Sequence, residues 1–252
     1  MTHYPAEENS ARKLLRLSVK LHYVTLKYTI SFFLAMVILK YIALFSLSFS
    51  IHYWLQILVE IITGFIIFYF FAAGLHSAHY ALMDKPVESM MANLKIIWEK
   101  KKIIYQTLVI YLLSVIAIFW LGKLIIVIVN RIAHNTTGEP TTAGIMIGAV
   151  LLIICAAMFY FSVPLAIIDK KPNHNFFYQS MLLSEKNKFG ILLSYSILGA
   201  TLLLLAPGMP HEYFLHVYHL DIVFDFIVLS VAGPIYFNLL LLLINDSKLL
   251  VK

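Results

Sequence analysis

Charged side chains are scarce in this chain of 252 residues. Asp, Glu, Lys and Arg make up 13% of it, whereas a soluble domain needs roughly a quarter of its residues charged to cover its surface. Hydrophobic residues reach 61%, and the mean hydropathy is +0.86. This composition argues against a water-soluble fold, and the length favours one compact membrane bundle over several domains.

Residues that form disulfides or hold catalytic groups are also missing. The one cysteine, Cys155, lies inside an apolar run, so neither an intramolecular disulfide nor a C-x-x-C zinc or redox motif can form. The chain contains no Walker loop, no G-x-S-x-G nucleophile motif and no dinucleotide fingerprint. We therefore expect no cofactor and no enzyme activity.

Apolar runs, in contrast, are abundant and long. Six of them have about the 20 residues that an α-helix needs to cross a hydrocarbon core. They lie at 29–50, 53–75, 103–124, 143–168, 189–207 and 222–244. The sequence predicts an all-α fold, a polytopic membrane bundle of six transmembrane helices with interfacial amphipathic helices. This single domain covers 29–252, and a cytoplasmic segment over 1–28 precedes it.

Lysine and arginine lie mostly on one side of these runs. Sixteen of the 19 fall in the N-terminal segment, the second and fourth connections or the C-terminal tail, and the exceptions are Lys40, Lys123 and Arg131. Short basic loops resist translocation, so both termini are expected in the cytoplasm. The net charge of +6 then favours anionic phospholipids of the bilayer as partners over nucleic acid, because no soluble module combines basic and aromatic residues.

The N-terminal segment has an amphipathic pattern. Arg12, Arg16 and Lys20 recur on one face of a helix. Apolar residues recur on another face, at Leu14, Leu17, Leu21 and Val24. Two interpretations fit this pattern. One is an amphipathic helix along the cytoplasmic interface, with its cations on lipid headgroups, and the other is the first turns of one long first helix.

Two connections on the cytoplasmic side share a sequence pattern. Each has a D-K-(K)-P turn, an apolar segment with helical spacing (87–98 in the first) and an E-K-x-K motif before the next run. Four residue pairs are 86 positions apart, namely Pro86 and Pro172, Glu99 and Glu185, Lys100 and Lys186, and Lys102 and Lys188. This predicts a parallel internal repeat over about 53–124 and 143–207, with an interfacial helix in each copy. Further headgroup contacts are expected from Lys100, Lys101, Lys102, Lys170 and Lys171.

The second copy carries a family resemblance. The stretch F-S-V-P-L-A at 161–166 ends an apolar run, a short helix containing a serine follows at 179–183, and N-K-F at 187–189 opens the next run. Over about 50–250 this arrangement resembles a loose group of uncharacterised six-helix bacterial inner-membrane proteins, related to the membrane domain fused to some glycerophosphodiester phosphodiesterases. The resemblance implies a multi-pass protein of the bacterial inner (plasma) membrane. It carries over no catalytic residue, because the phosphodiesterase active site belongs to a separate soluble domain.

Two pairs of opposite charge are predicted within the runs. Lys40 and Glu60 each lie ten residues from a turn centred near Ser50, so an antiparallel hairpin places them at the same depth. A lone charge there costs at least a few kcal/mol, which predicts that the two residues pair. The pair either locks the hairpin or borders a path for protons or anions. Lys123 and Asp225, near the outer ends of their runs, form the second predicted pair.

Histidines gather in the connection between the last two runs. His211, His216 and His219 have side chains that suit zinc or nickel, and they form a weak candidate metal site. The alternative is an aromatic and polar belt at the membrane surface, because Tyr213 and Tyr218 lie beside them.

These features predict an integral inner-membrane protein without a catalytic site, which interacts with lipid or belongs to a complex. A membrane-protein partner or a second copy of the chain is expected beside the lipid. One competing hypothesis is a small-solute or ion transporter or exporter that uses Lys40 and Glu60. The other is a membrane-bound lipid enzyme that uses the three outer histidines.

Overall fold

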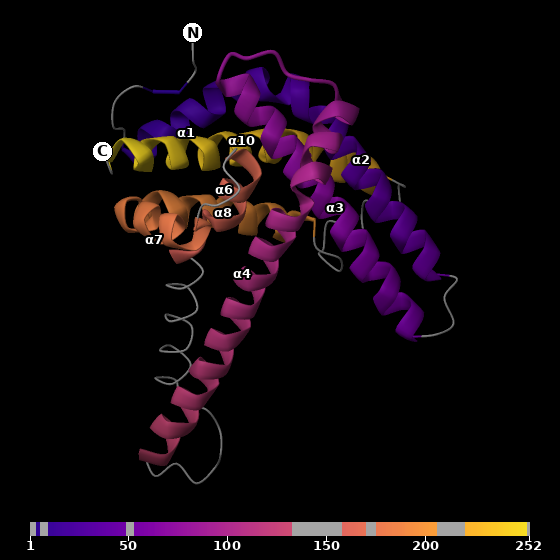
Figure 1. Ribbon diagram of the computed structural model, residues 1–252. Coiled ribbons are helices and arrows are strands. Elements are labelled where there is room, and N and C mark those ends of the chain that lie inside the picture. Colours follow the sequence, from indigo (N-terminus) through magenta and orange to yellow (C-terminus); the bar gives the residue numbers. More distant parts are fainter. Residues whose placement is uncertain are drawn as a thin grey trace. The chain divides into compact units, whose positions relative to one another are not determined.

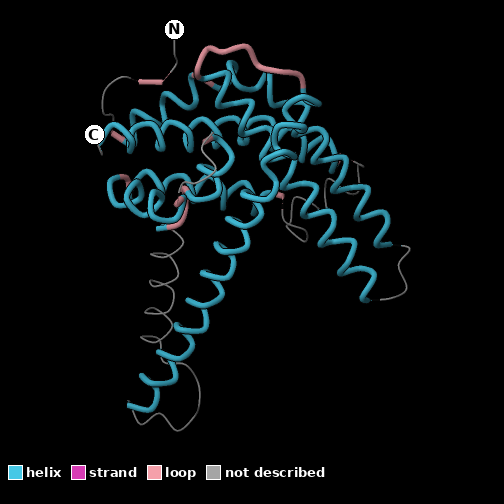
Figure 2. The backbone as a smooth tube through the Cα atoms, viewed as in Figure 1, coloured by secondary structure: helices cyan, strands magenta, loops and turns pink. Residues whose placement is uncertain are grey.

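The computed structural model describes residues 4–5, 10–48, 53–132, 158–169, 175–205 and 220–250, and every regular element in these residues is an α-helix (Figures 1 and 2). The helices are α1 (Ala11–Lys20), α2 (His22–Ser48), α3 (Tyr53–Leu82), α4 (Met90–Ile132), α6 (Ser162–Ile168), α7 (Phe176–Lys186), α8 (Lys188–Leu204) and α10 (Asp221–Leu250). The chain divides into two compact units. The first comprises Met1–Lys100 with Leu192–Lys252, and the second comprises Lys101–Ile191.

Several helices are long and apolar enough to cross a membrane. Four qualify, over His22–Ser46, Tyr53–Leu82, Met90–Ile128 and Asp221–Asp246. A fifth crossing results if α7 and α8, which are bent by 105° at the break between them, form one broken span. The prediction of an all-helical fold is confirmed for the described residues, as is the prediction of several helices long and apolar enough to cross a membrane. The predicted run 143–168 lies mostly outside the described residues, so the count of six stays a prediction.

The turn after α3 depends on one residue with a left-handed backbone. Asp84 has φ 54°, and its N–H donates to the carbonyl of Ala81 at 3.1 Å. The N–H of Lys85 donates to the carbonyl of Tyr80, also at 3.1 Å. These two bonds form a Schellman motif, which ends a helix by satisfying its last carbonyls.

The helix that follows is longer than the sequence pattern predicted. α4 begins at Met90, where the Ser89 hydroxyl accepts from the N–H of Ala92 at 3.3 Å as an N-cap. It continues for 43 residues without a break. The expected break between an interfacial helix at 87–98 and a span at 103–124 is therefore absent, and the interfacial location of the first segment stays a prediction. The charged motif at 99–102 consists of Glu and Lys, which continue a helix easily, and it contains neither Gly nor Pro.

The matching motif in the second predicted copy does end a helix. Asn187 stands where Lys101 stands in the first copy, and it caps α7 with φ −127° and ψ 39°. Its N–H donates to the carbonyl of Ser184 at 3.4 Å. Asparagine favours such ends because its short polar side chain competes with the helical backbone. The two copies of the predicted repeat therefore differ at this point.

The core of the first unit forms where α10 packs against α2 and α3. The ring of Phe237 in α10 lies 5.5 Å from that of Phe33 and 5.0 Å from that of Phe71, between centroids. Two glycines allow this close approach. A Cβ atom on Gly233 would lie 2.3 Å from the Phe33 ring, and one on Gly74 would lie 3.2 Å from the Phe237 ring. The absence of side chains at these positions fixes where the helices cross.

The N-terminal segment forms a helix of its own. The Ser10 hydroxyl accepts from the N–H of Lys13 at 3.4 Å at its start, and α1 ends at a turn at Leu21. Leu14, Ser18 and Leu21 are buried, and α1 runs alongside α10 (Figure 1). Of the two interpretations of this segment, the separate helix is therefore the one observed, with its apolar face covered by protein. Its location at the membrane interface stays a prediction.

In the second unit, two serines of α7 satisfy the backbone before α6. The Ser180 hydroxyl accepts from the N–H of Phe161 at 3.0 Å and donates to the carbonyl of Met158 at 2.9 Å. The Ser184 hydroxyl donates to the same carbonyl at 3.2 Å. Ser180 is the serine of the short helix in the family resemblance, and its bonds give it a structural role.

Candidate functional site

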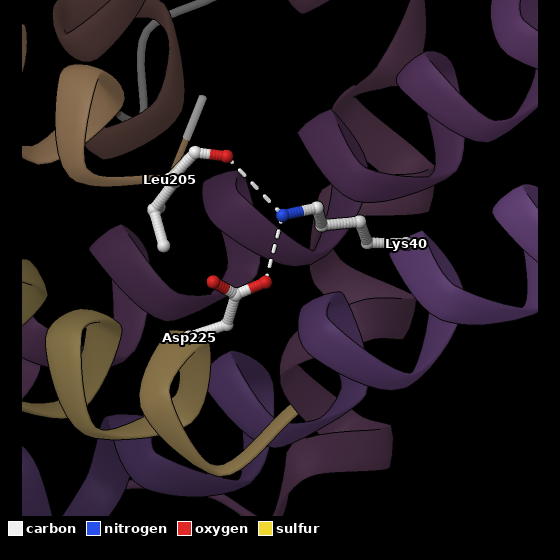
Figure 3. Close-up of polar contacts among 3 residues, drawn as sticks. All are labelled: Lys40, Leu205 and Asp225. Atoms are coloured by element: carbon white, nitrogen blue, oxygen red, sulfur yellow. Dashed lines mark hydrogen bonds and ion pairs between the residues drawn. The ribbon is translucent and has the colours of Figure 1, made fainter. Parts of the chain in front are cut away.

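Lys40 and Asp225 form an ion pair between two candidate membrane spans. The Lys40 Nζ atom lies 2.7 Å from Asp225 Oδ2 and so joins α2 to α10 (Figure 3). The side chain of Asp225 is 8% exposed and that of Lys40 is 32% exposed. Because an isolated charge inside a membrane costs several kcal/mol, each residue makes the other tolerable at this position.

The ends of two helices favour this arrangement. Lys40 Nζ also donates to the carbonyl of Leu205 at 3.3 Å, directly after the last residue of α8 (Figure 3). The last carbonyls of a helix have no partners within it and carry the negative end of its dipole. Asp225 lies in the second turn of α10, near the positive end of that helix. The ammonium therefore lies beside a helix end of opposite sign, and the carboxylate lies one turn inside the N-terminal end of α10.

The predicted pairing of Lys40 with Glu60 is wrong. Glu60 is exposed on α3, and the ammonium of Lys40 bonds to Asp225 and Leu205 instead. The distance of a residue from the turn of a hairpin gives only its position along the helix axis. A pair also requires both side chains to lie on facing sides, and Lys40 lies on the side of α2 that faces α10.

Asp225 instead has Lys40 as a partner, and its predicted pairing with Lys123, which belongs to the other compact unit, stays a prediction. The Nζ atom of Lys123 lies 5.3 Å from the ring centroid of Trp120, in α4. This is the geometry of a cation–π contact. The sequence thus identified both members of the observed pair but assigned each of them to a different partner.

Two polar side chains donate to backbone carbonyls of a neighbouring helix, one in α10 and one in α1. Pro234 lies inside α10 and has no N–H, so the carbonyl of Ser230 loses its usual intrahelical donor. His22 Nε2 lies 3.0 Å from that carbonyl and must carry a hydrogen, because a carbonyl only accepts. In return, Asn238 Nδ2 in α10 donates to the carbonyl of Ser18, near the end of α1, at 3.1 Å.

A buried polar contact joins α3 to the first turn of α4. His76 Nδ1 lies 2.9 Å from Asn93 Oδ1. The Asn93 amide nitrogen donates to the carbonyls of Glu88 and Ser89 at 2.9 and 3.2 Å. Its Oδ1 is therefore the acceptor, and His76 is protonated at Nδ1.

Residues 4–5 connect to the same unit through two further bonds. The Tyr4 hydroxyl lies 2.7 Å from His79 Nδ1 in α3, and Asn245 Nδ2 in α10 donates to the carbonyl of Pro5 at 3.1 Å. Burial raises the pKa of the Tyr4 phenol above its usual value, so the phenol stays a neutral hydroxyl beside the imidazole.

No sequence pattern predicted this set of buried and half-buried polar residues. Two local signals pointed to part of it. Pro234 within an apolar run requires a donor for the carbonyl four residues earlier, and Asn238 is a lone amide just before six consecutive apolar residues. The donor for the Ser230 carbonyl and the acceptor for the Asn238 amide are determined by how α1 and α2 pack against α10.

The predicted headgroup residues of α1 share one exposed face. Arg12, Arg16 and Lys20 are exposed, while Leu14 and Ser18 of the same helix are buried. At 1.5 Å per residue the three cations form a row roughly 12 Å long. In α4, Lys101 and Lys102 are exposed and Lys100 is half-buried.

The other predicted site residues lie outside the described part of the chain. They are Lys170, Lys171, His211, His216 and His219, whose roles stay predictions. Within the residues that the structure describes, no group of three His, Cys, Asp or Glu side chains is arranged to hold a metal ion.

No known protein family, no curated protein and no solved structure matches this chain. The resemblance noted above therefore rests on the motifs at 161–166, 179–183 and 187–189 and stays a prediction.

Proposed function

We propose that this chain is a non-enzymatic multi-pass protein of the bacterial inner membrane that binds anionic phospholipid headgroups through α1. The proposal rests on how α1 packs against α10. Its buried side, with Leu14 and Ser18, packs on α10, and Arg12, Arg16 and Lys20 are exposed on the other side. This arrangement fixes three cations next to the start of the first candidate span.

The size of the electrostatic effect supports lipid selection. Each Lys or Arg near an anionic membrane surface contributes roughly 1 kcal/mol. Three such residues contribute about 3 kcal/mol, or roughly a 100-fold preference for an anionic over a zwitterionic lipid. The bond from Asn238 to the Ser18 carbonyl holds the helix in place beforehand, which lowers the entropy lost on binding.

Native mass spectrometry of the detergent-extracted protein, mixed with phosphatidylglycerol and phosphatidylethanolamine, tests this function. The triple variant Arg12→Gln, Arg16→Gln and Lys20→Gln should lose most of the preference for phosphatidylglycerol. Arg16→Gln alone should lower it about fivefold. Lys95→Gln, which removes an exposed lysine of α4, is the matched control and should leave it unchanged. Equal retention by the wild type and the triple variant would disprove the proposal.

The Lys40–Asp225 pair favours a second candidate function, transport of a small solute or ion. Charged residues within membrane spans usually border a path for ions or substrate. The pair joins two candidate spans, and the side chain of Lys40 is 32% exposed. In this hypothesis Asp225 takes the role that the sequence analysis gave to Glu60.

Proton flux into proteoliposomes tests the second candidate. Vesicles that contain a pH-sensitive dye and a potassium gradient with valinomycin should acidify faster with the protein than without it. Asp225→Asn should abolish the difference, and Glu60→Gln should preserve it. Identical rates in vesicles with and without the wild-type protein would rule out proton transport.

A further inference from the structure

We infer that one anionic glycerophospholipid binds lengthwise along the outward face of α2. Its phosphate contacts a polar section formed by Lys20, Tyr23 and Lys27. Its acyl chains cover an apolar section formed by Ile30, Leu34 and Ile38. This inference rests on the proposed function and deepens it, because it names the bound molecule and places it on specific residues.

The two sections form one continuous stripe. From Tyr23 to Ile38 the residues follow one another at intervals of three or four, which places them on the same face of α2, and Lys20 is the last residue of α1 just before them. Lys20 and Lys27 are exposed, as is Tyr23 at 81%. Ile30, Leu34 and Ile38 are 39%, 44% and 47% exposed. The opposite face, with Thr25, Thr29 and Phe33, is buried in the unit.

The order of side chains along the stripe matches the order of groups in a phospholipid. Cations and a phenol come first, where a phosphate needs charge and hydrogen-bond donors, and aliphatic side chains follow. The Nζ atom of Lys27 lies 5.2 Å from the ring centroid of Tyr28. The long aliphatic stem of a lysine allows its ammonium to extend to the headgroup level. The 11 residues from Lys27 to Ile38 rise about 16 Å, close to half of a hydrocarbon core of roughly 30 Å. The stripe therefore has the length of one leaflet.

The polar section is held in place before any lipid binds. Lys20 belongs to α1, whereas Tyr23 and Lys27 belong to α2, and the turn at Leu21 joins the two helices. The bond from His22 to the Ser230 carbonyl fixes this turn against α10. Net negative charge is favoured over a zwitterionic headgroup, because Arg12 and Arg16 continue the same exposed row and repel an added ammonium.

A photoactivatable lipid tests the site directly. The probe is phosphatidylglycerol with a diazirine midway along one acyl chain, added at low fraction to the full-length protein in phosphatidylethanolamine nanodiscs. After irradiation, label should appear on the peptide that contains Ile30, Leu34 and Ile38. Unlabelled phosphatidylglycerol should compete this label away, and unlabelled phosphatidylcholine should not.

Two variants sharpen the result. Tyr23→Phe combined with Lys27→Gln should lower the labelling of that peptide about 30-fold, through the loss of one hydrogen bond and one cation. The matched control is Lys123→Gln, which removes another exposed lysine that lies over an aromatic ring, and it should leave the labelling unchanged.

Each other outcome has a defined meaning. Equal label on this peptide and on exposed α4 residues such as Ile116 and Trp120, without competition, would show bulk lipid only and overturn the inference. If the α1 triple variant loses phosphatidylglycerol while the Tyr23 and Lys27 variant keeps full labelling, the proposed function holds and the α2 site is wrong. Insensitivity of both measurements would overturn both.

Discussion

At the scale of single residues, Lys40 illustrates how the fold accommodates a charge. Its ammonium has two acceptors from two different helices, Asp225 in α10 and the carbonyl of Leu205 beyond α8. Removing one charge leaves the other in a poorly hydrated place without compensation, whereas removing both leaves an apolar contact. Loss of a single member should therefore harm the protein more than loss of the pair.

Lys40→Met should lower the free energy of unfolding by about 3 kcal/mol, because Asp225 remains buried without its cation. Adding Asp225→Leu should recover most of this loss. The exposed Glu60 provides the control, since Glu60→Gln should change stability by less than about 0.5 kcal/mol. Reversible unfolding in detergent micelles measures all three variants.

The charge swap, Lys40→Asp with Asp225→Lys, tests the two helix ends. It should not restore stability, because the new carboxylate faces the carbonyl end of α8 and the new ammonium lies near the start of α10. Complete recovery in the same unfolding experiment would show that the helix ends contribute nothing.

Gly233→Ala should destabilise the protein by about 1–3 kcal/mol, because its Cβ would lie 2.3 Å from the Phe33 ring. Gly64→Ala is the matched control, since nothing lies within 4 Å of the added atom and alanine favours the helix by roughly 1 kcal/mol. Thermal unfolding should therefore shift in opposite directions for the two variants. Equal shifts would contradict the close crossing of α2 and α10.

At the scale of helices, the ends are decided by short local motifs. α3 ends in a Schellman motif with Asp84 in the left-handed region, and α7 ends at Asn187. The charged motif that precedes the third predicted span carries neither feature, so α4 continues through it. Charge alone therefore does not end a helix in this chain.

Asp84→Val should lower the free energy of unfolding by about 1–2 kcal/mol, because a β-branched side chain clashes with the backbone at positive φ. Asp84→Gly also removes the carboxylate but tolerates this conformation, so it should stay closer to the wild type. Unfolding midpoints of the two variants provide the measurement. A smaller loss for valine than for glycine would refute the role of the Schellman motif.

At the scale of the whole molecule, the orientation in the membrane is the main open prediction. A cytoplasmic location of both termini is predicted by the basic residues that flank the apolar runs. Reversing the protein would move several lysines across the membrane against an inside-negative potential, at roughly 2.3 kcal/mol per charge for 100 mV.

Single cysteines in a Cys155→Ala background test the orientation. Lys13→Cys in α1 and Arg131→Cys near the end of α4 replace two exposed basic residues. An impermeant thiol reagent on intact cells should label position 131 and leave position 13 unlabelled until the cells are lysed. Labelling of position 13 on intact cells would reverse the assignment of sides, and with it the placement of the proposed lipid headgroup in the cytoplasmic leaflet.

From the amino-acid sequence alone it follows that the fold is helical, that several segments are long and apolar enough to cross a membrane, and that Arg12, Arg16 and Lys20 lie away from the apolar face of α1. These properties depend on hydropathy, on side-chain spacing and on the rise of 1.5 Å per residue, all of which are local to the chain. The position of Pro234 in the sequence also indicates that the carbonyl of Ser230 lacks its usual intrahelical donor.

Which groups meet depends on how the helices pack against one another. This packing placed Asp225 rather than Glu60 beside Lys40, covered the apolar face of α1 with α10, and brought His22 and Asn238 to backbone carbonyls in α10 and α1. The physical reason is that depth along a helix follows from residue number, whereas partnership depends on which faces of separate helices are packed together. The packing of α10 against α2, set by the missing side chain of Gly233, made that choice here.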